Sequence, residues 1–142
     1  MKKLLVVIIF CLLWSSTVSA RSIKDVEFIF RANPTECGNI AKAGDFVLGC
    51  HIPRKGKDLI VIRTGMNRAL TLMILTHELG HFYLQDVTYE QYKKVYGEGS
   101  YHDLNEKAAN EFYYFVWFPT VIPKTHYDFF VEMLLASLDK QD

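Results

Sequence analysis

The sequence lacks an excess of charge of either sign, because its 16 Lys and Arg residues are balanced by 16 Asp and Glu residues. The basic residues also form no continuous stripe along the chain. Proteins that bind nucleic acid through its phosphates ordinarily carry such a basic surface, so we expect no nucleic-acid partner. Internal repeats and low-complexity segments are absent as well, which excludes a repeat architecture.

Long hydrophobic runs are also missing. The run Leu4–Trp14 covers about eleven residues, whereas a membrane-spanning helix needs about 20. Two lysines precede this run and small residues follow it at Val18–Ala20, which is typical of a secretory signal peptide. We therefore predict a signal peptide at residues 1–20, a mature chain at residues 21–142, a secreted or periplasmic location, and membrane contact only through the transient signal peptide. An uncleaved N-terminal anchor is the alternative.

Cysteine is scarce, with 3 residues in the chain. Cys11 lies in the predicted signal peptide, which leaves Cys37 and Cys50. In an exported protein these two are expected to form a disulfide, because the destination is oxidising. The alternative is two separate thiols.

The mature chain has the length of one domain with a modest core. Its patterns predict an α+β fold in which a short mixed sheet packs on helices. The expected elements are a strand or helical turn at Val26–Phe30, a short helix at Glu36–Ala43, strands at Phe46–Ile52 and Leu59–Ile62, a helix at about residues 67–84, a helical turn at Tyr89–Val95, a helix at Asp103–Trp117, and a last helix after Pro123.

The feature that carries most chemistry is the pentapeptide His77-Glu78-Leu79-Gly80-His81. On a helix, residues four apart share one face, so His77 and His81 are spaced to hold one metal ion. Glu78 lies beside that ion, where a catalytic base is needed. This pattern predicts a Zn²⁺ site and a small zincin-like domain. Gly80 inside a helix indicates close approach of another backbone, and simple tolerance of one glycine is the alternative.

Catalytic zinc usually has three protein ligands, so a third is expected downstream. Glu106 is the preferred candidate, because it begins the second long helix and Asn110 follows one turn later on the same face. Asn110 could hydrogen-bond a ligand histidine, and Ala108 and Ala109 leave room for the two helices to approach. Asp103 is a weaker candidate that could cap the helix, and Glu111 is expected to face solvent. The remaining downstream acidic residues are Asp86, Glu90, Glu98, Asp128 and Glu132.

The two motifs together resemble the ImmA/IrrE-type zinc metallopeptidases. That family combines a His-Glu-Leu-Gly-His helix with a helix of the form Glu-x-x-Ala-Asn-x-Phe-Ala, and the chain has Glu106-Lys107-Ala108-Ala109-Asn110-Glu111-Phe112 followed by Pro119. The resemblance covers about residues 44–120. It implies that His77, His81 and Glu106 bind zinc and that Glu78 is the catalytic base. Asn110 corresponds to the Asn of the family's second motif. The chain departs from the pattern at Ala108 and Tyr113, and in its export signal.

These observations predict an exported zinc peptidase in which Glu78 activates water against a peptide bond of a protein or peptide substrate. The strand Leu59–Ile62 is expected to lie at an edge that could pair with an extended substrate. Tyr101, His102 and His126 are possible donors to the oxyanion, although a structural role is the favoured alternative for each of them. His51 is expected to be a simple strand-end residue.

Two other functions stay open. One is a non-catalytic, zinc-stabilised secreted binding or inhibitor protein. The other is a zinc hydrolase that acts on a cell-envelope component, for which the aromatic residues 112–118 would offer a sugar-stacking surface. Because so apolar a helix is usually buried, we expect these aromatic residues to pack in the interior instead.

Overall fold

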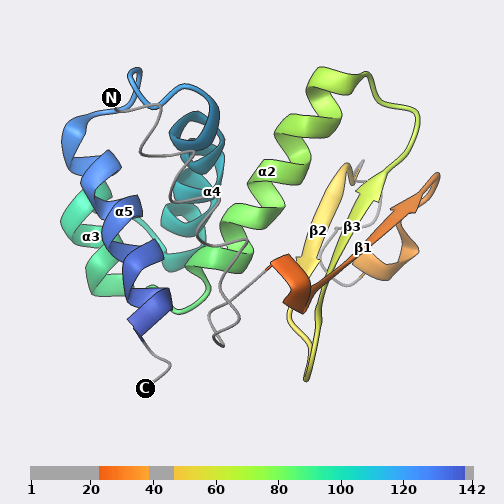
Figure 1. Cartoon of the computed structure of the whole chain (residues 1–142), viewed down its shortest axis with the longest axis horizontal. Coiled ribbons are helices and arrows are strands. Elements are labelled where there is room, and N and C mark those ends of the chain that lie inside the picture. The colour runs from red at the N-terminus through yellow and green to blue at the C-terminus, as the bar shows by residue number, and fades with distance from the viewer. Residues whose placement is uncertain (1–22, 39–46, 140–142) are drawn as a thin grey trace.

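The computed structural model describes residues 23–38 and 47–139 (Figure 1). The predicted signal peptide lies outside the described residues, as does most of the helix predicted at Glu36–Ala43. The described start of that segment is a single 3-10 turn, η2, at Thr35–Cys37. A second such turn, η1 at Ile23–Asp25, precedes the first strand.

The sheet has three strands in the order β1-β3-β2, which confirms the predicted α+β fold with a mixed sheet. The strands are β1 at Val26–Arg31, β2 at Gly49–Ile52 and β3 at Asp58–Arg63. Strand β1 pairs with β3 in parallel, and β2 pairs with β3 antiparallel. The strand predicted at Leu59–Ile62 is therefore the central strand, and the prediction that it forms an edge is wrong. The edge strand next to the helices is β2.

Strand β3 is buried on both faces because its side chains alternate between two apolar clusters. Leu59 and Val61 pack with the two cysteines, whereas Ile60 and Ile62 belong to the main core beneath the helices. This is the period-2 alternation of a strand covered on both sides. The burial explains why this segment has a nearly continuous hydrophobic sequence.

Four helices follow the sheet: α2 at Arg68–Leu84, α3 at Tyr89–Tyr96, α4 at Tyr101–Trp117 and α5 at Lys124–Asp139. Helix α2 lies between the sheet and the other three helices (Figure 1). Asn67 caps α2 as predicted, since its side chain accepts a hydrogen bond from the Leu70 amide at 2.9 Å. Helix α4 begins two residues earlier than predicted, because Ser100 rather than Asp103 is its N-cap. Within the described part, every helix is too short or too polar to cross a membrane.

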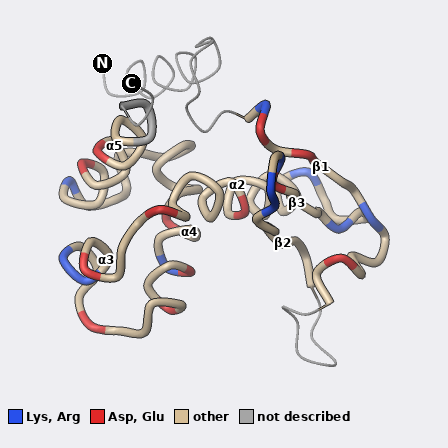
Figure 2. Tube along the Cα trace, turned by 90° about the horizontal axis from the view of Figure 1, so that it is seen from below, with Lys and Arg blue, Asp and Glu red and all other residues tan. Residues whose placement is uncertain are grey.

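Charged residues of both signs occur in both layers. Figure 2 shows Lys and Arg along the strands and on α3, with Asp and Glu interspersed among them. The expectation of no nucleic-acid partner stays a prediction.

Helices α2 and α4 approach closely at Gly80, as the sequence indicated. A Cβ atom built on Gly80 would lie 3.1 Å from the Ala109 Cα and 3.1 Å from the Phe112 Cβ. Ala108 and Ala109 are both fully buried at this contact. The small residues therefore bring the histidines of α2 alongside the face of α4 that carries Glu106.

Gly80→Ala is expected to destabilise the protein, although alanine is the better helix former. The gain in helix propensity is about 1 kcal/mol, but the added methyl group meets backbone atoms and a Cβ that cannot rotate away, and overpacking of this kind costs about 1–3 kcal/mol. Denaturant unfolding of the two proteins measures the difference. An increase in the free energy of unfolding would contradict the close approach of the helices.

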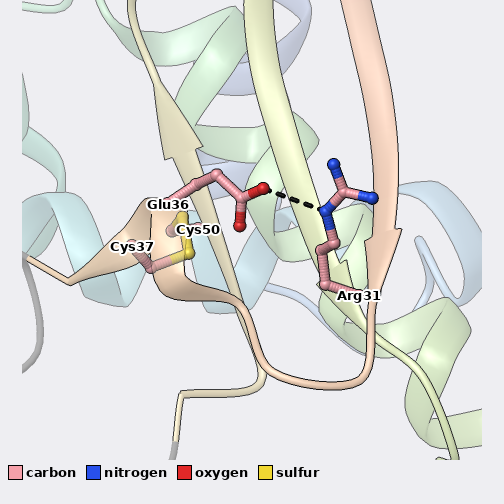
Figure 3. The surroundings of a disulfide bond; sticks show 4 residues. All are labelled: Arg31, Glu36, Cys37 and Cys50. Carbon is pink, nitrogen blue, oxygen red and sulfur yellow. Dashed lines mark hydrogen bonds and ion pairs between the residues drawn. A yellow bond between two sulfur atoms is a disulfide. The ribbon is translucent and has the colours of Figure 1, made fainter.

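The predicted disulfide is present between Cys37 and Cys50, with 6.0 Å between the two Cα atoms. It joins η2 to the edge strand β2, and both cysteines are buried. Figure 3 shows the ion pair that lies beside it, in which the Arg31 Nε donates to the Glu36 carboxylate at 2.9 Å. The disulfide therefore holds η2 against β2, the strand that lies next to α2 (Figure 1).

Replacing both cysteines with alanine is expected to lower the free energy of unfolding by about 3 kcal/mol, because the cross-link restricts the unfolded chain. Denaturant unfolding of the double variant and of the wild type measures this loss. Reducing agent should destabilise the wild type and leave the double variant unchanged. Equal stability of the two proteins would show that the cross-link contributes nothing.

Candidate metal centre

Helix α2 presents His77 and His81 on one face, with 3.0 Å between their Nε2 atoms. Their rings are nearly perpendicular, at 86°, with 4.6 Å between the centroids. Each side chain is 15% exposed, so both rings are mostly buried while their Nε2 atoms converge on one point. The i, i+4 spacing of the motif produces this geometry directly.

Glu106 of α4 lies against both histidines. One carboxylate oxygen is 3.4 Å from the His77 Nε2, and the other is 3.2 Å from the His81 Nε2. Hydrogen bonds from the two imidazoles hold the pKa of the Glu106 carboxyl far below its usual value. Burial by itself would lower the pKa of His77, but the hydrogen bond to Glu106 and the charges of Glu78 and Glu106 outweigh it and raise that pKa.

The donor set fits a metal ion. The ligand atoms of His77, Glu78 and His81 all lie within 4.8 Å of one another, and this cluster could hold a metal ion. A tetrahedral zinc with bonds of about 2.0–2.1 Å needs ligand atoms about 3.3 Å apart. The separations of 3.0, 3.2 and 3.4 Å among His77, His81 and Glu106 are close to that value.

Glu78 is the more buried of the two carboxylates, at 6% exposed. Burial raises its pKa above the usual range, although the two histidines act in the opposite direction. The backbone amide of His51, on strand β2, donates a hydrogen bond to it. Gly49 of the same strand allows this approach, because a Cβ there would lie 3.3 Å from the Glu78 Oε1 and 2.7 Å from the Ile74 Cγ2.

Asn110 contacts His77 as predicted, with 3.0 Å between the Asn110 Oδ1 and the His77 Nδ1. Because an amide oxygen can only accept a hydrogen bond, the Nδ1 atom carries the proton in this arrangement. Nε2, the atom directed at His81 and Glu106, is then the ring nitrogen that can give up its proton and offer a lone pair to a metal ion. Asn110 therefore fixes the tautomer that a metal ligand needs.

Asn110→Ala is expected to weaken zinc binding by about 10- to 100-fold, which is typical for the loss of a partner behind a ligand histidine. Competition with a chromogenic chelator measures the affinity. Asn105→Ala is a suitable control, because Asn105 lies on the same helix and donates to the Tyr92 hydroxyl instead, at 2.8 Å. Equal affinity of Asn110→Ala and wild type would mean that the contact does not orient His77.

A cleft of about 430 Å³ opens in front of this cluster. Strand β2, helix α2 and the first turns of α4 form its walls. The lining residues are Gly49, Cys50, His51, Pro53, His77, Glu78, His81, Gln85, Tyr101, His102, Asn105 and Glu106. One side of the His77, His81 and Glu106 cluster therefore faces the cleft.

Two of the three predicted oxyanion donors, Tyr101 and His102, line the cleft. The Tyr101 hydroxyl donates to the Val87 carbonyl at 3.2 Å, so it is already engaged. His126 is not among the described lining residues, and its Nδ1 contacts the Glu111 carboxylate at 2.8 Å. Tyr101 and His102 are both exposed at the cleft, and of these two possible donors only Tyr101 has a described hydrogen bond that engages its side chain.

The expectation that Glu111 faces solvent is wrong. Its side chain is half-buried and accepts a hydrogen bond from the Tyr96 hydroxyl at 2.8 Å. Glu111 links α4 to α3 and α5 in this way. The described lining of the cleft includes none of the other acidic residues that we considered as ligands. They are Asp86, Glu90, Glu98, Asp103, Asp128 and Glu132.

The aromatic residues of α4 divide between the interior and the surface. Phe112 and Phe115 are buried as expected, whereas Tyr114, Trp117 and Phe118 are about half exposed. The Trp117 indole donates to the Thr76 hydroxyl at 3.1 Å. Packing therefore explains only part of this aromatic run.

Sequence reasoning missed the role of His51. Its Nε2 contacts the Asp58 carboxylate at 2.8 Å, and its backbone amide reaches Glu78. The only signal available was its position in a strand close to the motif helix, since no spacing rule links His51 to Asp58 or Glu78. The pairing of β2 with β3 brings these residues together.

None of the protein-family models matches the chain, and no curated protein or solved structure matches it either. The resemblance to ImmA/IrrE-type metallopeptidases accordingly stays a prediction.

Proposed function

We propose that the protein is an exported zinc-dependent peptidase of the ImmA/IrrE type. The observation that carries the proposal is the position of Glu106, whose two oxygens lie 3.4 and 3.2 Å from the Nε2 atoms of His77 and His81. This arrangement supplies three ligands and leaves Glu78 beside them as a separate carboxylate. Two imidazoles, one carboxylate and an open position are the donor set of a catalytic zinc site.

When bound, zinc would act as a Lewis acid that lowers the pKa of water and polarises a carbonyl group. Glu78 takes up the proton from water at its carboxylate and passes it to the leaving amine. The raised pKa of Glu78 suits both steps, because burial makes the carboxylate a better proton acceptor than an exposed one. Asn110 keeps His77 in the tautomer that presents Nε2.

Strand β2 supports the choice of a peptide as substrate. The Arg63 amide donates to the Leu48 carbonyl at 2.8 Å, so alternate residues after Leu48 pair with β3. Gly49 and His51 consequently direct their backbone groups away from β3, towards the cleft that they line. An extended peptide could pair with the carbonyls at this edge, a common mode of peptide recognition.

The two alternative functions have less support. A structural zinc site normally closes all four positions with protein ligands, whereas this cluster faces an open cleft. A hydrolase of cell-envelope sugars would need stacking surfaces at the cleft. Of the exposed aromatic residues Tyr101 lines the cleft, whereas Tyr114, Trp117 and Phe118, from the run considered for stacking, are not among its described lining residues. The buried disulfide is compatible with the exported location that we propose.

The test is zinc quantification together with digestion of a peptide library by the purified mature chain. We expect about one zinc per chain and cleavage that a chelator abolishes and added zinc restores. Glu78→Gln is the control for contaminating proteases, and it should bind zinc without cleaving. A zinc-loaded wild type that cleaves no peptide would favour the non-catalytic binding protein.

A further inference from the structure

Asp58, the first residue of β3, joins three elements that border the cleft. It is 7% exposed, and one carboxylate oxygen contacts the His51 Nε2 at 2.8 Å. The same oxygen accepts from the Gln85 amide at 3.3 Å, and the other accepts from the Arg54 backbone amide at 3.0 Å. Asp58 therefore ties the edge strand, the β2–β3 turn and the C-terminal end of α2 together.

His51 connects this network to Glu78. Its ring is held between Asp58 and the edge of Phe82, whose ring centroid lies 6.0 Å away. Only 5% of the His51 side chain is exposed, so the ring has little freedom to move. The backbone amide of the same residue donates to the Glu78 carboxylate. The ring contacts therefore anchor the residue whose amide meets the Glu78 carboxylate.

We propose that Asp58 and His51 are positioning residues for Glu78, which rests on the proposed peptidase function. Asp58 holds the His51 ring in place, and the His51 amide then keeps the Glu78 carboxylate oriented beside the two histidines. The same network sets the position of the edge strand relative to α2, because Gln85, the C-cap residue of α2, shares the Asp58 oxygen. The proposal assigns no proton transfer to either residue.

A purely structural role would not require this chemistry. Burial of an acidic side chain against an imidazole is costly, and apolar side chains close a hairpin at least as well. The groups that Asp58 holds also converge on the cleft, since His51 and Gln85 both line it. The Asp58–His51 pairing is therefore better explained by its effect on the position of Glu78 than by stability alone.

The activity test compares Asp58→Asn and Asp58→Ala with wild type on one peptide substrate. We expect kcat to fall about 10- to 100-fold, because small displacements of a catalytic group cost this much, while KM stays within about twofold and zinc stays near one per chain. Glu36→Ala is the matched control, since Glu36 pairs with Arg31 on the same sheet but lies outside the described cleft lining. Phe129→Leu, a buried change on α5, serves as a second control for lost stability.

A second measurement does not depend on activity. The His51 amide should exchange with solvent about tenfold faster in metal-free Asp58→Ala than in metal-free wild type, and its proton resonance should move upfield as the hydrogen bond to the carboxylate weakens. Metal-free Glu78→Gln should move the same resonance, whereas metal-free Glu36→Ala should not.

The outcomes separate the two proposals. If wild type cleaves no peptide, the peptidase function fails, and the His51 amide still decides whether Asp58 positions it. An unchanged His51 amide in Asp58→Ala would overturn the inference. A kcat loss in Asp58→Asn no larger than that in Phe129→Leu at equal thermal stability would overturn it as well.

Discussion

Glu78→Gln is expected to lower kcat by about 10²- to 10⁴-fold, which is the usual contribution of a general base. The neutral amide cannot take up the proton from water, although its oxygen can still accept the hydrogen bond that the His51 amide donates to Glu78. Zinc content should stay near one ion per chain, because His77, His81 and Glu106 are unchanged. Steady-state kinetics and metal analysis of the same preparation measure both quantities.

The control for this variant is Glu98→Gln, which makes the same chemical change at an exposed carboxylate paired with Lys93. It should leave kcat unchanged. If Glu78→Gln kept full activity, Glu78 could not be the base. If it lost its zinc, Glu78 would be a ligand rather than a neighbour of the ion.

The stability of the metal-free protein gives a second readout of the same variant. Because burial raises the pKa of Glu78 in the folded state, the folded protein binds more protons than the unfolded chain. The contribution of Glu78 to the free energy of unfolding therefore falls as the pH rises above 4.5, the ordinary pKa of a glutamate side chain. Glu78→Gln should remove this part of the pH dependence and be the more stable protein at neutral pH. Denaturant unfolding across this pH range measures it.

Glu106→Gln is expected to weaken zinc binding by more than about 100-fold, beyond the effect typical of a residue behind a ligand. The substitution removes the only negative charge that lies within 3.4 Å of both Nε2 atoms in the described cluster. Competition with a chelator of known affinity measures the change. Activity at limiting zinc should fall in parallel.

Glu111→Gln is the matched control for Glu106, because it makes the same change on the same helix at a carboxylate that contacts Tyr96 and His126 instead. It should leave zinc affinity near that of wild type. Unchanged affinity in Glu106→Gln would place the third ligand at another residue and remove the observation on which the proposed function depends.

Several features of the site followed from local sequence rules. The bounds of α2 agree with the predicted helix because the Asn67 cap and the apolar spacing act within one or two turns. The close approach at Gly80 followed from the cost of glycine in a helix, and it was confirmed by the contact with Ala109. The pairing of Cys37 with Cys50 followed from the small number of cysteines and the predicted export signal.

Two predictions were wrong for the same physical reason. The apolar pattern of Leu59–Ile62 predicts a strand but not its neighbours. Strand order depends on how separate segments pair, and this strand pairs on both sides. The position of Glu111 on α4 predicts exposure to solvent, because spacing along one helix does not reveal that His126 of α5 packs against it. Both errors concern contacts between elements distant in sequence.

The sequence by itself determined the pair His77 and His81, because residues four apart on a helix converge whatever surrounds them. It also determined that an acidic side chain stands beside them at Glu78. Only the tertiary structure decided which distant carboxylate meets the histidines, which strand borders the cleft, and that Asp58 and His51 reach Glu78. Those contacts depend on the packing of α4 and the sheet against α2, which no spacing along the chain specifies.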